Sequence, residues 1–137
     1  MPIDYRNYPD NWKTEIRPSI LKRAENKCEK CGVENYAVGW RENGWFIHAM
    51  TFKSGNRRKR WLFSTYKQAR IAADSCNKEL KLVGINKKCI VIVLTIAHLN
   101  HDIADNREDN LKALCQRCHN VMDAPYRAKN RKQKTIK

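Results

Sequence analysis

The chain has 137 residues, of which 28 are Lys or Arg and 14 are Asp or Glu, so its formal net charge is +14. This length favours a single domain, and the positive charge favours a polyanionic partner, with nucleic acid ahead of an anionic membrane surface. Hydrophobic residues make up 42% of the chain, which excludes a simple disordered basic tail. No apolar run reaches the length of a membrane span, and the N-terminus lacks a signal-peptide core, so we expect a cytoplasmic protein.

The N-terminal part of the sequence predicts an aromatic arm followed by a short helix. Residues 1–17 are polar and aromatic, and we interpret them as an ordered arm that lays three rings on the domain, those of Tyr5, Tyr8 and Trp12. Pro18 suits the first turn of a helix, and this helix leads the chain to the first cysteine.

The next segment predicts β-structure. Ring-bearing and branched side chains predict a strand over residues 45–52, and a turn is expected over residues 54–59, with Gly55 and Asn56 at its centre. A second apolar stretch at residues 61–63 is the expected partner strand.

A helix follows these strands. Apolar residues recur at helical spacing from residue 66 to residue 82, which predicts an amphipathic helix. We interpret residues 36–88 as a β-β-α insertion within a single domain of residues 1–137.

The C-terminal part predicts two further strands and a final helix. Residues 89–99 are expected to form one mostly buried strand, and residues 111–115 a short one. A helix is expected to begin near residue 118, and the basic tail at residues 127–137 is expected to fray.

Four of the six cysteines form two knuckles of identical spacing, Cys28-x2-Cys31 and Cys115-x2-Cys118. In a reducing compartment such pairs are metal ligands more often than disulfides, and four thiolates complete the tetrahedral shell of a structural Zn²⁺. The alternative is two accidental pairs of buried thiols. The remaining cysteines lack this spacing and are interpreted as core thiols: Cys76 and Cys89.

A His, an Asn and a second His accompany the C-terminal knuckle. His98 ends a hydrophobic run, Asn110 opens the next strand-like run, and His119 directly follows the second cysteine pair. This order resembles the HNH endonucleases, over residues 18–34 and 90–126, and the string NL-x-x-LC-x-x-CH is its most specific part. The resemblance implies an α+β fold with a small zinc-stabilised ββα-metal core, which here carries an inserted β-hairpin and helix.

The resemblance also implies a reaction and its residues. His98 would be the general base for hydrolysis of DNA phosphodiester bonds, since an imidazole changes charge near neutral pH. Asn110 would hold the loop and orient this base, and His119 would bind a catalytic Mg²⁺, Mn²⁺ or other divalent transition metal ion. The alternative interpretations are a structural His that caps the strand, a simple turn Asn, and a His that packs on the knuckle.

Two further side chains are candidates for the catalytic ion. If the last helix starts near residue 118, His119 and Asp123 lie at positions i and i+4 and project together. Many HNH proteins carry a metal-binding Asp or His directly before the base, but this chain has Ala97 there. His101, or Asp102 beside it, could take over that role, or the site could be weakened. Asp123 could also simply precede a helix break at an Ala-Pro pair.

A cluster of cations surrounds the expected hairpin turn and is interpreted as a phosphate-binding surface: Lys53, Arg57, Arg58, Lys59 and Arg60. A solvated hairpin tip is the alternative. Trp45 and Trp61 lie close by in the sequence; either ring could stack on an unpaired base, but we expect both in the core. The tail at residues 127–137 is a second non-specific phosphate binder or a solvated terminus.

These observations support three hypotheses. The first is a metal-dependent HNH endonuclease of phage or bacterial type that acts on DNA, double-stranded before any other form, with RNA as a further candidate. The second is a zinc-stabilised nucleic-acid-binding module in which Ala97 marks weakened or lost catalysis. The third is an RNA-binding or inhibitor-like protein that uses the same core as a scaffold.

Overall fold

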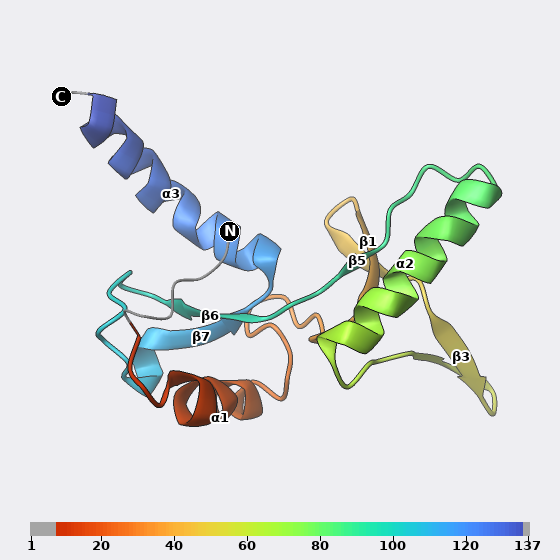
Figure 1. The fold of residues 1–137 in the computed structure, drawn as a ribbon, viewed down its shortest axis with the longest axis horizontal. Helices are drawn as coiled ribbons and strands as arrows, with labels where there is room; N and C mark the ends of the chain where they lie inside the picture. The colour runs from red at the N-terminus through yellow and green to blue at the C-terminus, as the bar shows by residue number, and fades with distance from the viewer. Residues whose placement is uncertain (1–7, 136–137) are drawn as a thin grey trace. The chain divides into compact units, whose positions relative to one another are not determined.

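The computed structural model describes residues 8–135. The chain divides into two compact units, which are described one at a time (Figure 1). We call residues 1–32 with 94–137 the knuckle unit, and residues 33–93, which interrupt it in the sequence, the inserted unit. The sequence predicted an insertion at 36–88 within one domain. The architecture is mixed α+β, with small antiparallel sheets and helices in both units.

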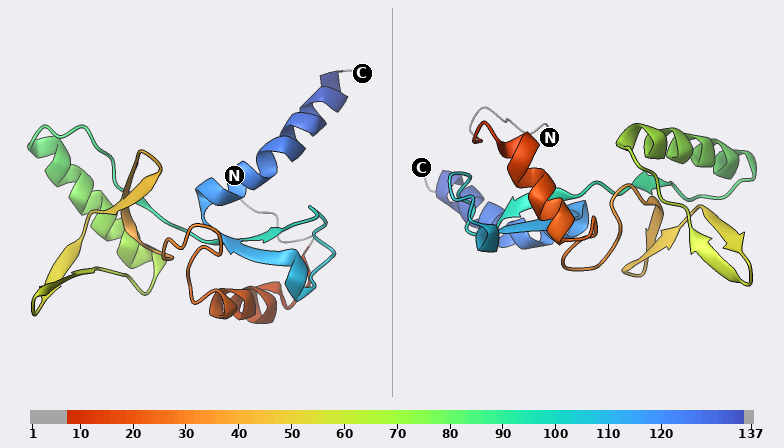
Figure 2. Two further views of the ribbon diagram at one scale, coloured as in Figure 1. Left: turned by 180° about the vertical axis from the view of Figure 1, so that it is seen from behind. Right: turned by 90° about the horizontal axis from the view of Figure 1, so that it is seen from below.

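The knuckle unit is built on a two-stranded antiparallel hairpin. Strands β6 (Thr95–His98) and β7 (Leu111–Leu114) pair with Thr95 opposite Leu114 and His98 opposite Leu111. The short turn η3 (Glu108–Asn110) leads into β7. Helices α1 (Arg17–Arg23) and α3 (Gln116–Thr135) lie on the two sides of this hairpin (Figures 1 and 2).

The predicted aromatic arm lies on this hairpin. Trp12, which opens the single π-helical turn η2 (Trp12–Ile16), is only 4% exposed. Its ring stacks on Tyr8 at a centroid distance of 4.7 Å and on His98 at 5.3 Å. Tyr8 and Trp12 therefore confirm the prediction, whereas Tyr5 lies outside the described residues.

In the inserted unit, a helix packs on a three-stranded antiparallel sheet. The strand order is β2 (Trp45–His48), β1 (Val38–Glu42), β5 (Ile90–Val91), and helix α2 (Tyr66–Leu82) confirms the helix predicted at 66–82. Its alanines face the sheet because the apolar residues share one side of the helix. The buried side chains of this core are Val38, Ala69, Ala73, Cys89 and Val91.

One glycine allows the close approach of β1 and β2. Gly39 pairs with His48, and a Cβ atom built on Gly39 would lie 1.8 Å from the carbonyl oxygen of Ile47. Such a distance is far inside van der Waals contact, so no other residue fits this position without displacement of the β2 backbone.

Strands β3 (Thr51–Ser54) and β4 (Arg57–Arg60) form a separate antiparallel ribbon, joined by a two-residue turn at Gly55 and Asn56. The turn predicted over residues 54–59 is confirmed at its centre, but residues 57–59 belong to β4, and two further predictions nearby are wrong. The strand expected over 45–52 is interrupted at residues 49–50, and the partner strand lies at 57–60 instead of 61–63. Long basic side chains can occupy both faces of this ribbon because all of its residues are solvent-exposed.

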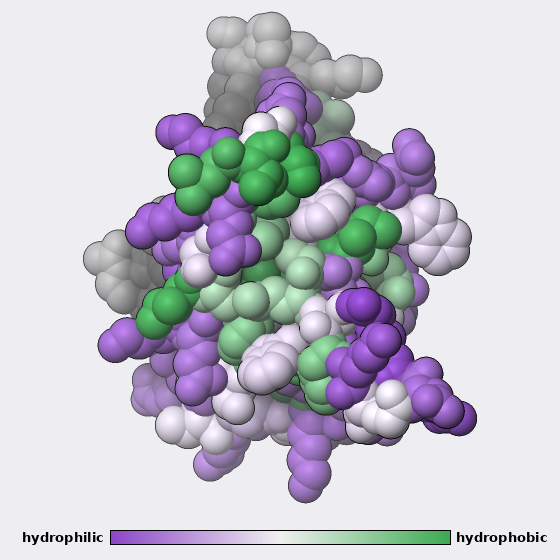
Figure 3. Space-filling model, turned by 90° about the vertical axis from the view of Figure 1, so that its right-hand side faces the viewer, coloured by the Kyte–Doolittle hydropathy of each residue, from purple (hydrophilic) through white to green (hydrophobic). Residues whose placement is uncertain are grey.

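The expected burial of two tryptophans is also wrong. Trp45 is 73% exposed and Trp61 is 50% exposed. Trp45 opens the edge strand β2, whose residues alternate between exposed and half-buried, and it lies on the exposed face. Trp61 directly follows β4, and an isolated two-stranded ribbon has no apolar layer that could bury such a ring. Figure 3 shows the side of the molecule where α2 and β3 lie in Figure 1: hydrophobic side chains gather over the middle of this face, and hydrophilic side chains surround them.

Two predictions for the C-terminal half need correction. Residues 89–99 do not form one strand, since β5 belongs to the inserted unit and β6 to the knuckle unit, with residues 92–94 between them. The tail does not fray from residue 127, because α3 continues to Thr135 despite Pro125 in its interior. The Lys, Arg and Gln residues that follow Pro125 are good helix formers.

Within the described part of the chain, no helix combines the length and apolarity needed to cross a bilayer.

Candidate functional site

The four knuckle cysteines converge in the knuckle unit. The Sγ atoms of Cys28, Cys31, Cys115 and Cys118 all lie within 4.8 Å of one another. The Sγ atoms of Cys31 and Cys115 are 3.7 Å apart. Sulfurs at the corners of a tetrahedron around Zn²⁺, with bonds of about 2.3 Å, lie about 3.8 Å from one another. The cluster therefore has the composition and spacing of a site that could hold a metal ion such as zinc.

Backbone hydrogen bonds shape both knuckles. Gly32, with φ of +81°, donates its N–H to the carbonyl of Cys28, and Glu29 donates to the carbonyl of Ala113. The second bond ties the first knuckle to strand β7, which leads directly into the second knuckle. This local folding brings the two pairs together although more than eighty residues separate them in the sequence.

The electrostatics of the cluster favour thiolate formation at one sulfur. Burial raises the pKa of Cys28, but hydrogen bonds from the backbone N–H groups of Cys31, Cys115 and Lys30 outweigh it and lower this pKa to about 7. Burial raises the pKa of Cys118, and hydrogen bonds with the neighbouring cysteines raise it further. Metal binding requires the deprotonated form of every ligand, so binding at this cluster releases protons.

A second group of potential ligands lies on the first turns of α3. His119 and Asp123 face each other at positions i and i+4, with Nε2 3.1 Å from one carboxylate oxygen. The other oxygen of Asp123 lies 3.1 Å from Nε2 of His101. Asp123, two residues before Pro125, therefore lies on an unbroken helix, and the structure brings together the three side chains predicted to bind the catalytic ion.

The contacts of His119 permit the tautomer that a metal ligand needs. The Thr95 hydroxyl lies 2.7 Å from Nδ1 of His119 and donates to the carbonyl of Leu114 at 3.4 Å. A lone pair of this hydroxyl can accept a hydrogen bond from Nδ1–H, and in that tautomer the lone pair of the neutral ring lies on Nε2. That lone pair faces a carboxylate oxygen, and such an arrangement is favourable only with a proton or a metal cation between them.

His101 reaches the cluster through an unusual backbone conformation. Its φ is +62°, and its N–H donates to the carbonyl of His98, so the chain turns sharply directly after β6. The imidazole stacks on Tyr126 at a centroid distance of 4.1 Å. A non-glycine residue in the left-handed region is uncommon, and the stacked ring and the Asp123 contact hold it there.

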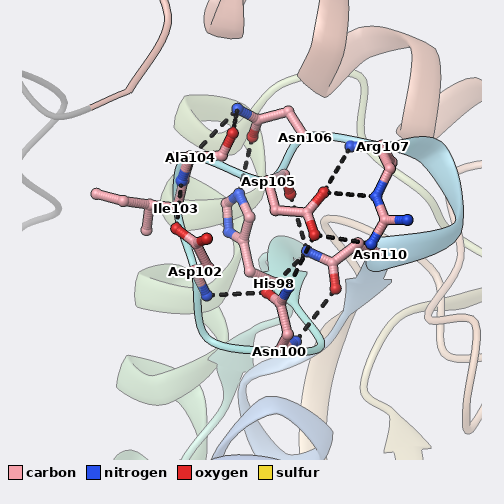
Figure 4. A network of polar contacts seen from close by, with 9 residues as sticks. All are labelled: His98, Asn100, Asp102, Ile103, Ala104, Asp105, Asn106, Arg107 and Asn110. Carbon is pink, nitrogen blue, oxygen red and sulfur yellow. Dashed lines mark hydrogen bonds and ion pairs between the residues drawn. The ribbon is translucent and has the colours of Figure 1, made fainter.

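The side chain of Asn110 holds the polar loop that follows β6, as shown in Figure 4. It is 6% exposed, and its Oδ1 accepts a hydrogen bond from the backbone N–H of Asn100. Its Nδ2 donates to the Asn100 side chain at 3.0 Å and to the carbonyl of Asp105 at 2.8 Å. Asn110 therefore closes the polar loop between β6 and η3 from within.

The ring of His98 contacts residues outside this ligand group. His98 is 7% exposed, and Trp12 and Tyr8 pack against its ring. Its Nε2 lies 2.9 Å from Oδ1 of Asn106, whose Nδ2 donates to backbone carbonyls of the same loop. That amide orientation makes Oδ1 the acceptor, so Nε2 carries the proton and Nδ1 the lone pair of the neutral ring.

The two residues beside His98 and His101 do not join the ligand group. Ala97 is 1% exposed and lacks a ligand atom. Asp102 caps its own loop, with its carboxylate accepting a hydrogen bond from the N–H of Ala104. Of the two side chains that could replace the missing ligand, only His101 contacts Asp123.

The predicted phosphate-binding cations lie on the ribbon of the inserted unit, and all are exposed: Lys53, Arg57, Arg58, Lys59 and Arg60. Arg60 also forms an ion pair of 3.0 Å with the buried carboxylate of Glu34, and Arg58 donates to the Thr51 hydroxyl. An open pocket of about 520 Å³ adjoins the ribbon, with Trp61 and Phe63 in its lining. Trp61 also makes an edge contact with Phe52 at 5.4 Å.

Three residues with direct contacts to the candidate histidines were not predicted from the sequence: Thr95, Asn106 and Tyr126. Thr95 is three residues before His98 on the same strand, and the alternation of strand side chains could have placed it on the face opposite that base. Asn106 and Tyr126 have no comparable signal, because long-range folding alone brings them to the site.

Comparisons with known proteins identify no relative. No family model matches the chain, and neither the curated proteins nor the solved structures gave a match. The resemblance to HNH endonucleases therefore rests on the residues of this chain and their arrangement.

Proposed function

We propose that the protein is a metal-dependent endonuclease of the HNH type, which hydrolyses phosphodiester bonds in DNA. The observation that carries the proposal is the meeting of His101, His119 and Asp123 next to the four-cysteine cluster in one unit. The order β6, β7, α3 corresponds to the two strands and helix that the family uses for its metal site.

The donor set fits a divalent cation. Two imidazoles and one carboxylate suit Mn²⁺ and softer transition metals, and they also accept Mg²⁺ with additional water ligands. The four-cysteine cluster does not serve this purpose, since four thiolates leave no open position for substrate. In this proposal the four-cysteine cluster is structural, and the group of His101, His119 and Asp123 is catalytic.

Hydrolysis requires a deprotonated water and stabilisation of the charge that develops on the phosphate and on the leaving oxygen. A divalent ion supplies that charge stabilisation when bound. His119, His101 and Asp123 would hold it, with Thr95 fixing the tautomer that presents Nε2 of His119. Such support by an outer hydrogen bond is typical of metal-binding imidazoles.

His98 is proposed as the general base, acting through Nδ1. The contact of Nε2 with Asn106 holds the ring and directs the lone pair to Nδ1. Asn110 fixes the ends of the loop that contains Asn106, and so positions the base indirectly. The stacked Trp12 covers one face of the ring, which leaves its edge as the route for the substrate water.

The ribbon β3–β4 would supply most of the affinity for DNA. Its exposed cations can each neutralise a phosphate and release a counterion, so binding is expected to weaken steeply with salt. A two-stranded ribbon also has dimensions that fit the major groove of a duplex. Arg60 is the least available of these cations because Glu34 already pairs with it.

A second candidate function is supported by one observation. The residue before the proposed base is Ala97, which is buried and cannot bind an ion. A protein that binds nucleic acid through the ribbon without cleaving it is consistent with this feature. Cleavage and binding are therefore measured separately in the test.

The test is incubation of the purified protein with supercoiled plasmid in Mg²⁺, Mn²⁺, Co²⁺ or Ni²⁺, with and without a chelator. We expect nicking with at least one ion and none with the chelator. His98→Ala and His119→Ala should each lower the rate by at least 100-fold, the scale of a lost general base or metal ligand. Asn120→Ala, on the exposed side of the same helix, is the matched control and should retain the wild-type rate.

Two outcomes would overturn the proposal. The first is the absence of cleavage with every ion in a protein that still binds DNA, which would support the second candidate. The second is equal cleavage by the wild type and by both histidine variants, which would indicate a contaminating nuclease. Circular dichroism of each variant shows whether its fold is retained.

A further inference from the structure

Two cysteines of the inserted unit lie in contact, away from the metal-binding knuckles in the sequence. Cys76, in the third turn of α2, and Cys89, directly before β5, have Sγ atoms 2.9 Å apart. Both are free thiols. The sequence predicted two core thiols, which is confirmed for Cys89 at 1% exposure, while Cys76 is half-buried against the same core and is the more accessible of the two.

The backbone around the pair is held in place. The side chain of Asn77 accepts a hydrogen bond from the N–H of Cys89 at 2.7 Å and donates to the Cys89 carbonyl at 3.2 Å. An ion pair between Lys87 and Glu42 fixes the preceding segment to strand β1. The two sulfurs are therefore brought together by a rigid frame, and joining them requires little movement.

We propose that Cys76 and Cys89 are a redox-sensitive pair that forms a reversible disulfide with low-molecular-weight disulfides such as oxidised glutathione. The half-buried thiol of Cys76 is the entry point, and the buried thiol of Cys89 completes the bond. This inference is independent of the nuclease proposal, because it uses only residues of the inserted unit.

The exchange proceeds in two steps. The Cys76 thiolate attacks one sulfur of oxidised glutathione, which breaks that S–S bond, forms a mixed disulfide and releases one glutathione thiolate. Cys89 then loses its proton to solvent and attacks Sγ of Cys76, which forms the Cys76–Cys89 bond and releases the second glutathione. The protein loses two electrons and two protons, and the small disulfide gains them.

The environment of the two thiols sets this order. Burial raises the pKa of Cys89 to about 12, and the S–H hydrogen bond to Cys76 contributes to the same shift. Cys89 is thus the poorer first nucleophile, and the half-buried Cys76 is the more accessible thiol for the first attack.

Trypsin digestion gives a direct test, because all six cysteines fall on different peptides of this sequence. Cys76 lies on residues 71–78 and Cys89 on residues 89–107. The zinc-loaded full chain is incubated with mixtures of oxidised and reduced glutathione, trapped with N-ethylmaleimide, digested and analysed by mass spectrometry. We expect cross-linked peptides 71–78 and 89–107, reversed by dithiothreitol, and a rise of about 10 °C in the thermal midpoint of the inserted unit.

Single substitutions test the proposed order. Cys89→Ser should leave Cys76 as a mixed disulfide with glutathione, whereas Cys76→Ser should leave Cys89 unmodified. The absence of the cross-link in wild-type protein at any glutathione ratio would overturn the proposal. Preferential modification of Cys89 in the Cys76→Ser variant would overturn the order of the two steps and with it the role of Cys76 as entry point. Peptide yields from unoxidised samples provide the control for recovery.

Discussion

Replacement of Asn110 by Ala tests how the loop between β6 and η3 is held. Asn110 is 6% exposed, and its side chain makes three hydrogen bonds, to the backbone N–H and side-chain oxygen of Asn100 and to the carbonyl of Asp105. Alanine removes all three, so the backbone N–H of Asn100 and the carbonyl of Asp105 lose the partner that Asn110 supplies, while the Asn100 side-chain oxygen keeps the N–H of Asp102. Of the bonds that Asn110 makes across the loop, the backbone one between Leu99 N–H and the Asn110 carbonyl would remain.

The magnitude follows from the count of these bonds. Each hydrogen bond of this kind contributes about 1 kcal/mol to the free energy of unfolding, so the variant should lose about 3 kcal/mol. In a unit of this size that loss corresponds to a fall of about 15 °C in the thermal midpoint. Asn110→Asp keeps the acceptor but places a carboxylate oxygen against the Asn100 and Asp105 oxygens, so its effect should be at least as large.

Differential scanning calorimetry of the metal-loaded protein provides the measurement. Asn120→Ala is the matched control, since its side chain is exposed on α3, and its midpoint should lie within about 2 °C of the wild type. An Asn110→Ala protein that unfolds at the wild-type temperature would refute the reasoning, because it would mean that the three bonds do not stabilise the loop.

Three further predictions follow from the two units. Gly39→Ala should destabilise the inserted unit by at least about 3 kcal/mol in urea unfolding, since its Cβ would lie 1.8 Å from the Ile47 carbonyl oxygen; a wild-type midpoint would contradict the close approach. Removal of the metal from the four-cysteine cluster should release one zinc ion per chain, measured with a colorimetric chelator, and unfold the knuckle unit; retained structure without metal would contradict a structural role. The hydrogen bonds from Arg107 lower the pKa of Asp105 to about 2 from 3.8, so their stabilising effect is present above pH 4 and lost as the pH falls towards 2. Unfolding of Asp105→Asn should lack this part of the pH dependence, and an unchanged profile would assign it elsewhere.

Local sequence patterns predicted the elements whose signals are periodic. The alanines and leucines of residues 66–82 recur at helical spacing, and α2 has those bounds. The identical spacing of the two cysteine pairs predicted a shared cluster across a long stretch of sequence, and the four sulfurs meet. In both cases a regular spacing of residues, which can be read directly from the sequence, predicts which side chains lie together.

Other elements depend on which surfaces meet in the fold. The run at residues 89–99 is apolar apart from Thr95 and His98, and it carries no period that shows its contribution to two different sheets. The cations at residues 57–60 looked like a turn because of their charge, but an exposed ribbon accepts them as a strand. The stacking of Trp12 on His98 joins residues more than eighty positions apart, and nothing local indicates that contact.

In the candidate site, too, local spacing predicted some contacts, and others depend on the folded chain. His119 and Asp123 were predicted as neighbours because helix geometry places positions i and i+4 side by side. The contact of His101 with Asp123 requires a left-handed residue after β6, and Thr95 and Asn106 act through hydrogen bonds that only the folded chain creates. Sequence patterns therefore predicted two ligands on one helix, while the structure supplies the residues that hold and orient them.

The central claim is that His101, His119 and Asp123 bind a divalent cation separate from the one held by the cysteines. Anomalous diffraction from crystals grown with Mn²⁺, recorded on both sides of the manganese edge and of the zinc edge, tests it most directly. We predict a manganese peak within bonding distance of Nε2 of His119 and the Asp123 carboxylate, and a zinc peak among the four sulfurs. The account would be contradicted if manganese were found only on other surface carboxylates while the imidazoles of His101 and His119 remained hydrogen-bonded to Asp123.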